Sequence, residues 1–180
     1  MRVRANISTC SRRWPLTSLL VVLGVVLPLC LLAASPAAMV TIDSSGAQPR
    51  QVEDTTVTAV QRDYGRAWHM LETAIEENQA ALLDSAFTGV AREKLSQAIA
   101  DQQKNGLKRR YVDHGHQVRV VFYSIDGSAI QVQDAANLEI QMLDGNKVVH
   151  SEHTTVRYLA LLTPAENSWK VRVIESVPGF

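Results

Sequence analysis

The feature that most constrains this fold is a change in the spacing of apolar residues along the chain. Between residues 57 and 75 they recur every three or four positions, which is typical of a helix with one apolar face. These residues are Val57, Val60, Tyr64, Ala67, Trp68, Leu71 and Ile75. From residue 117 onwards, apolar and polar residues alternate, which is typical of strands that bury one face. Helices followed by strands predict the α+β class.

The helical half contains three segments. Either Asp54 or Thr55 is suited to cap the first helix. The polar face of this helix, including Asp63, is expected to contact solvent. A short apolar segment follows over residues 81–87, and a second amphipathic helix then runs to a natural stop at Asn105-Gly106. The inward residues of this second helix are expected to be Val90, Ala91, Leu95, Ala98 and Ile99.

Turn sequences divide the second half into four strands. Asp-Gly pairs at 126–127 and 144–145 are typical of hairpin turns, and residues 164–168 supply a third turn. Residues 148–162 are long enough for one bent strand. The strand before it alternates most regularly, with an apolar face of Ile130, Val132, Ala136, Leu138, Ile140 and Met142. We therefore expect two to three helices packed on one face of a curved, four-stranded antiparallel sheet.

The N-terminal part differs from the rest of the chain. Residues 16–34 carry no charge and are almost entirely apolar. As a helix they would extend about 28 Å, close to the hydrocarbon thickness of a bilayer. The basic leader before them, residues 1–15, contains Arg2, Arg4, Arg12 and Arg13. By the positive-inside rule this leader stays in the cytoplasm, and the rest of the chain is exported.

Two fates of the apolar segment stay open. Its length favours an uncleaved single-pass anchor in the cell membrane, because the apolar core of a secretory signal is shorter, about 7–15 residues. The alternative is a secreted or periplasmic protein after cleavage near Ala37, where Ser35-Pro36-Ala37 supplies a small-x-small site. Residues 35–52 are rich in Ser, Ala, Gly and Pro and predict a flexible linker before a domain over residues 53–180.

Charge and cysteine content narrow the function classes. The whole chain has 18 basic and 18 acidic residues and no net charge. Four of the basic residues precede residue 35, so the exported part is acidic, which disfavours nucleic acid as a partner. Both cysteines, Cys10 and Cys30, also precede residue 35, which leaves the exported part without disulfides or thiolate chemistry.

Four short motifs occur in a defined order in the exported part. They are KNG at 104–106, DGNKVV at 144–149, TVRY at 155–158 and WKVRVIE at 169–175. Together they resemble the nuclear transport factor 2-like, or cystatin-like, α+β roll. The most similar groups are the intermembrane-space domains of chloroplast-division proteins and the Mce-associated, membrane-tethered rolls. The resemblance covers residues 55–177 and implies a cone-shaped pocket, but it leaves the function open because this fold hosts isomerases, dehydratases, carriers and binding modules.

Asp134 is the candidate general base of an enzyme with this fold. It interrupts an apolar strand face between Val132 and Ala136, where burial would raise its pKa towards neutrality. We favour a second interpretation, in which a bulge at Ala135 turns the carboxylate towards solvent. His114 and His116 are further candidates for acid–base work, and no catalytic residue is assigned.

The histidines also raise the question of a metal. His114 and His116 are two positions apart, so they could share a strand face and bind a metal beside Asp113. His150 and His153 are three positions apart, so only one of them could join the site from a regular strand. Histidines at strand edges and in loops are more common than metal sites, and we expect no metal and no cofactor.

The sequence favours a non-catalytic interaction or assembly domain over an enzyme. A protein partner or a second copy would bind the outer sheet face, with contacts from Gln131, Gln133, Glu139 and Gln141. The cluster Lys108, Arg109 and Arg110 either opposes the negative end of the second helix or contacts anionic lipid head groups. The alternative function is a small-molecule binder, or an isomerase- or dehydratase-like enzyme, that uses the cone pocket. A pocket with a convergent acid would favour the enzyme.

Overall fold

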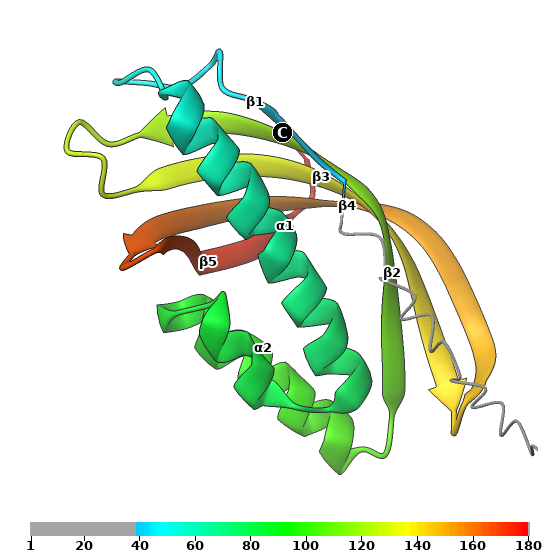
Figure 1. Cartoon of the computed structure of the whole chain (residues 1–180). Coiled ribbons are helices and arrows are strands. Elements are labelled where there is room, and N and C mark those ends of the chain that lie inside the picture. Colours follow the sequence, from blue (N-terminus) through cyan, green and yellow to red (C-terminus); the bar gives the residue numbers. More distant parts are fainter. Residues whose placement is uncertain (1–38, 180) are drawn as a thin grey trace, which may run out of the picture. The chain divides into compact units, whose positions relative to one another are not determined.

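The structure is a computed structural model that describes residues 39–179. Its elements are β1 (Val40–Asp43), α1 (Asp54–Glu77), a 3₁₀ helix η1 (Ala80–Ser85), α2 (Gly89–Lys104), β2 (Lys108–Tyr123), β3 (Ile130–Asp144), β4 (Lys147–Ala165) and β5 (Ser168–Val177). The strands form one curved sheet in the order β1-β2-β3-β4-β5, and α1 and α2 lie on its inner face (Figure 1). The expected α+β architecture, with helices packed on a curved sheet, is confirmed.

The sheet has five strands rather than the four that we expected. The additional strand is β1, which pairs in parallel with β2 so that Val40 lies opposite His116. It comes from a segment whose Ser, Ala and Gly content predicted a linker. The side-chain amide of Gln61 in α1 donates a hydrogen bond of 2.7 Å to the carbonyl of Val40. This edge strand thus depends on contacts that local composition does not report.

Helix α1 ends where the sequence predicts, but its N-cap is Glu53, so the predicted caps Asp54 and Thr55 are already the first two residues of the helix. Its apolar stripe, including Trp68, is buried against the sheet. Asn78 ends the helix in the left-handed conformation, with φ of 54°. Asp63 was expected to contact solvent, but it is buried because its Oδ2 accepts the backbone N–H of Trp169 at 2.8 Å.

Three apolar residues that we expected to face inward are exposed. In α2, Val90 is 46% exposed and Ala98 is also exposed, whereas Ala91 and Ile99 are buried. The inward stripe therefore starts one residue later than predicted. Met142 at the end of β3 is also exposed, because a register irregularity beside it turns Leu143 into the core.

Strand β2 begins well before residue 117, where the alternation of apolar and polar residues first becomes visible. Its first half carries arginines that bond to the helices. Arg109 Nε donates to Gln102 Oε1 at 3.0 Å, and the guanidinium of Arg110 pairs with Glu76 at 2.6 Å. Because these positions carry charged residues that bond to the helices, the first half of β2 shows no alternation of apolar and polar residues.

Three expectations concern residues outside the described part of the chain. They are the basic leader 1–15, the apolar segment 16–34 and the cleavage site near Ala37. Within residues 39–179, no helix combines the length and the apolar character that crossing a membrane requires.

Candidate functional site: a buried acid–base cluster and a separate cavity

Asp134 lies on the inner face of β3, and its side chain is completely buried. The sequence-based interpretation of an outward bulge at this position is therefore wrong. The hydroxyl of Tyr64 in α1 donates a hydrogen bond of 2.8 Å to Asp134 Oδ2. The same oxygen lies 2.8 Å from Nδ1 of His116 in β2. A buried carboxylate requires such partners, and α1 and β2 supply them to Oδ2, whereas the buried Oδ1 has no hydrogen-bond partner among the described residues.

His116 lies between two carboxylates. Its imidazole is inaccessible to solvent, with Nδ1 at Asp134 and Nε2 3.0 Å from Asp113 Oδ2. Burial lowers the pKa of His116, but the hydrogen bonds and charges of Asp113 and Asp134 outweigh it and raise the pKa to about 9. The imidazole is consequently protonated at neutral pH, and each of its two N–H groups donates to one carboxylate.

A bulge at Gly115 places His114 and His116 on opposite faces of the sheet. The pairing of β2 with β3 shifts between Asp113 and His116, and Gly115 has φ of 122°, a conformation that favours glycine. A Cβ on Gly115 would also approach the carbonyl of Met39 to 3.3 Å. The prediction that the two histidines share a strand face is thus wrong, because an extra residue separates them.

Glu72 in α1 adds a further carboxyl group to this cluster. Its Oε1 accepts the backbone N–H of Asp113 at 2.9 Å. Burial and the nearby charge of Asp113 raise the pKa of Glu72 to about 7. The cluster therefore contains three carboxyl groups around one imidazolium.

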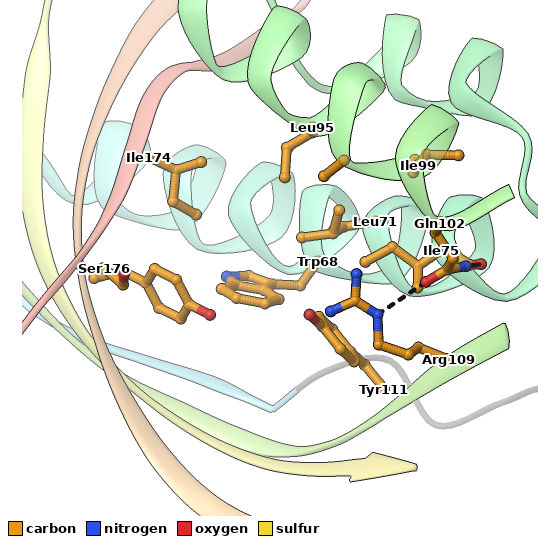
Figure 2. Close-up of a pocket in the computed structure, with 12 residues that line it drawn as sticks. Trp68, Leu71, Ile75, Leu95, Ile99, Gln102, Arg109, Tyr111, Ile174 and Ser176 are labelled. Carbon is orange, nitrogen blue, oxygen red and sulfur yellow. Dashed lines mark hydrogen bonds between the residues drawn. The ribbon is translucent and has the colours of Figure 1, made fainter. Parts of the chain in front are cut away.

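A cavity of about 230 Å³ lies between α1, α2 and the inner face of the sheet. Helix side chains such as Leu71, Leu95 and Ile99 form an apolar wall, and Arg109 and Tyr111 lie across from it (Figure 2). The complete lining is Trp68, Leu71, Ile75, Leu95, Ala98, Ile99, Gln102, Arg109, Tyr111, Tyr158, Ile174 and Ser176. Among the described residues, no carboxylate forms an ion pair with Arg109.

The cavity does not reach the acid–base cluster. Neither Asp134 nor His116 lines it. Trp68, which does line it, packs on the imidazole of His116 with ring centroids 4.5 Å apart, and Tyr158 packs on Trp68 at 5.2 Å. The cavity walls within the described chain thus contain no carboxylate and no imidazole, so a ligand there would find hydrogen-bond donors but no general base.

Arg109 and Tyr111 are the residues that sequence reasoning missed as members of a pocket. The sequence does contain a pattern that could have identified them: Arg109, Tyr111 and Asp113 are spaced by two, as residues on one face of a strand are. The start of β2 had to be recognised first. Arg110, in contrast, pairs with Glu76 outside the cavity lining.

The outer face of the sheet carries an uncharged row across four strands. Phe122, Gln131, Leu161 and Val173 are paired neighbours on β2, β3, β4 and β5, and we call them the outer-face row. Together with Leu159, Ala160 and Glu175 they line a shallow groove of about 340 Å³. Gln133 lies on the same face, facing a second hollow beside β1, whereas Glu139 and Gln141 lie further along β3.

Comparison with known proteins identifies the fold family. No family model and no curated protein sequence matches the chain. The solved intermembrane space region of the chloroplast protein ARC6 is 14% identical, with 71% of this chain and 98% of that chain covered and a TM-score of 0.60. An NTF2-like family protein from Streptomyces avermitilis is 13% identical, with 69% and 97% covered and a TM-score of 0.46. This chain therefore has the nuclear transport factor 2-like α+β fold that its motifs resemble.

Proposed function

We propose that this domain is a non-catalytic interaction module that binds a second copy of the chain through the outer-face row. The observation that carries the proposal is the row itself: Phe122, Leu161 and Val173 put apolar side chains on a sheet face that no described helix covers. Apolar patches of this kind mark interaction sites. The row itself carries no charge, and Glu175 at the edge of the groove is paired with Lys94 at 2.8 Å, so the row can face its own copy with little like-charge repulsion. A different protein partner is the alternative occupant.

The position of the acid–base cluster supports a non-catalytic role. His116 and Asp134, at the centre of the cluster, are completely buried. Glu72, at its edge, lines a separate hollow of about 270 Å³ that also contains Asp113 but not His116 or Asp134. A general base has to come within hydrogen-bond reach of its substrate. Trp68 stands between the buried His116–Asp134 pair and the cavity, so this pair is better suited to stabilise the core.

The N-terminal segment supports a membrane-tethered location for this module. In this proposal residues 16–34 remain as a single-pass anchor, residues 1–15 stay in the cytoplasm and the domain lies on the other side of the membrane. Cleavage near Ala37 would release the same domain as a secreted or periplasmic protein. Tethering would raise the local concentration of the domain and so favour pairing through the sheet face.

Site-specific cross-linking tests the interaction. A photo-reactive phenylalanine in place of Gln131, in the full chain in its native membrane, is expected to give an adduct of twice the chain mass. The same residue in place of Val149, which is exposed on β4 outside the row, is expected to give little adduct. Leu161→Asp should reduce the adduct at 131 at least about tenfold, because an interface would bury an unpaired charge.

The outcomes are distinct. Val149→Asp makes the same chemical change on the same strand and should leave the adduct unchanged. An adduct with another protein would assign the row to a different partner. Equal yields from positions 131 and 149, or no adduct from either, would contradict an interface at the outer-face row.

Arg109 favours a second function, the binding of a small amphipathic anion in the cavity. Its guanidinium lies beside the tyrosine side chain of Tyr111 and opposite apolar helix residues (Figure 2). Gln102 fixes its orientation by accepting from Nε, which leaves the other guanidinium nitrogens to bind a carboxylate. A ligand with one carboxylate and a short apolar chain would match both halves of this lining.

Octanoate is a suitable probe for this second function. We expect it to bind more tightly than octanol, which has the same chain without the charge. Arg109→Gln should weaken octanoate binding at least about tenfold, because a hydrogen bond to a charged group contributes about 1.5–3 kcal/mol. Arg110→Gln is the matched control, since Arg110 pairs with Glu76. Calorimetric titration that found equal affinities for both variants would contradict an anion site at Arg109.

A further inference from the structure

Three potential metal ligands converge on the outer face of the sheet, away from the cavity and from the outer-face row. They are His114 of β2, Glu139 of β3 and His153 of β4, and one ligand atom from each lies within 4.8 Å of the others. Glu139 and His153 are paired neighbours, and the bulge at Gly115 turns His114 outward beside them. His150, three positions from His153, pairs with Met142 and does not belong to the group.

The distances within this group fit a shared metal better than hydrogen bonds. Nε2 of His114 and Nε2 of His153 lie 3.6 and 3.4 Å from the same carboxylate oxygen, Glu139 Oε2. Hydrogen bonds between nitrogen and oxygen are about 2.7–3.2 Å long. Two ligands of a tetrahedral zinc ion, each about 2.05 Å from the metal, are about 3.3 Å apart. The side chains therefore already have nearly the separation that zinc requires.

The second oxygen of Glu139 is held by neighbouring donors. Gln141 Nε2 donates to Oε1 at 2.9 Å, and the hydroxyl of Ser151 donates to the same atom. Hydrogen bonds of this kind orient a metal-binding carboxylate and leave one oxygen free for the ion.

The two imidazoles are also held in position. The rings of His114 and His153 stack at 29° with centroids 4.9 Å apart, so their Nε2 atoms point towards the same region. The side chains of His114 and His153 are 38% and 64% exposed, whereas that of Glu139 is 20% exposed. A metal ion can therefore enter from solvent without any rearrangement of the core.

We propose that His114, Glu139 and His153 form a zinc site with Nε2, Oε2 and Nε2 as ligands. Two imidazoles and a carboxylate suit zinc and related transition metals, whereas magnesium and calcium prefer oxygen ligands alone. Three protein ligands leave one tetrahedral position open on the solvent side, where water can bind. This site does not depend on the proposed pairing of the outer-face row.

Zinc titration of the untagged full chain in detergent tests the site, because a polyhistidine tag would itself bind zinc. Competition with a chromogenic chelator is expected to show one zinc ion per chain. His153→Ala and His114→Ala should each weaken binding at least about tenfold, as the loss of one ligand from a site of three does. Magnesium at the same concentration should not compete.

His150→Ala is the matched control, since it removes an exposed histidine of the same strand that lies outside the group. It should leave zinc affinity unchanged. The replaced side chains are exposed or half-buried, so the apo variants should keep the wild-type unfolding midpoint. No binding by the wild type, or equal affinity of His153→Ala and His150→Ala, would overturn the site.

Discussion

Replacing His116 with alanine is expected to lower the free energy of unfolding by about 3–5 kcal/mol, the loss typical of a buried ion pair from which one partner is removed. The imidazolium lies between Asp113 and Asp134 and has no contact with solvent. Its removal would leave two buried carboxylates without their cation. It would also remove the ring that packs on Trp68. Urea unfolding followed by tryptophan fluorescence measures this loss.

A second substitution tests whether uncompensated charge is the cause. Asp134→Asn in the His116→Ala background neutralises one of the two stranded carboxylates. We expect it to recover part of the lost stability, although it is destabilising in the wild type, where it breaks the pair. A double variant that is less stable than His116→Ala alone would mean that lost packing, rather than charge, dominates.

His114→Ala is the control for the His116 substitution. It lies two positions away on the outer face and is 38% exposed, so we expect its effect to stay within roughly 0.5 kcal/mol. A loss below about 1 kcal/mol for His116→Ala would contradict a charged, paired imidazole. The difference between the two losses in unfolding free energy thus measures the stabilisation by a histidine that the bulge at Gly115 places in the core.

The parts of the fold that follow from local geometry could be predicted from the sequence. A helix places every third or fourth residue on one face, so Trp68 and its stripe identify α1 and its buried side. A strand places every second residue on one face, so the alternation around Val132 identifies β3 and its inner side. The same alternation places Asp134 in the core, which is where the structure has it.

The site could not be predicted to the same degree, because its contacts join distant residues. An unpaired buried carboxylate would be costly, which made an outward Asp134 the more reasonable interpretation. Its partner Tyr64 is 70 positions away. The bulge at Gly115 lies against the carbonyl of Met39, the residue just before β1. Neither contact leaves a pattern in the surrounding sequence.

The edge of the sheet and the cavity illustrate the same limit. Strand β1 is short and lies in a Ser- and Gly-rich segment, which predicted a linker. Its contact with Gln61 of α1 cannot be recognised from that local composition. Arg109 belongs to the basic cluster that we expected to oppose the negative end of the second helix or to contact lipid head groups. Its role in the cavity depends on Gln102 and Tyr111, which become its neighbours only after β2 folds against α2.

The second large effect expected is a fall in stability as the pH rises from 6 to 10. The pKa of His116 is about 9 in the folded domain, compared with an ordinary value of 6.5. A raised pKa means that the folded state binds this proton more tightly than the unfolded chain. The stabilisation is therefore complete below about pH 6.5 and is lost as the pH passes 9. A shift of this size corresponds to about 3 kcal/mol.

Glu72 changes the stability in the same direction at lower pH. Its pKa is raised to about 7 from an ordinary value of 4.5, so its contribution is present below about pH 4.5 and is lost as the pH rises through 7. Glu139 acts in the opposite direction, since its lowered pKa makes the domain less stable only when the pH falls below about 4.5. The domain is therefore expected to be most stable near pH 4.5.

Urea unfolding across the pH range separates the two groups. Glu72→Gln should flatten the decline between pH 4.5 and 7 and leave the decline between pH 7 and 10 in place. His116→Ala should remove the upper decline, because the group that titrates is gone. Glu72→Gln keeps the contacts of the imidazole with Asp113 and Asp134 and the hydrogen bond of Tyr64 to Asp134, so the titrating group keeps its partners in that variant. A constant or rising stability of the wild type between pH 7 and 10 would mean that His116 is neutral in the folded domain, which would contradict the raised pKa.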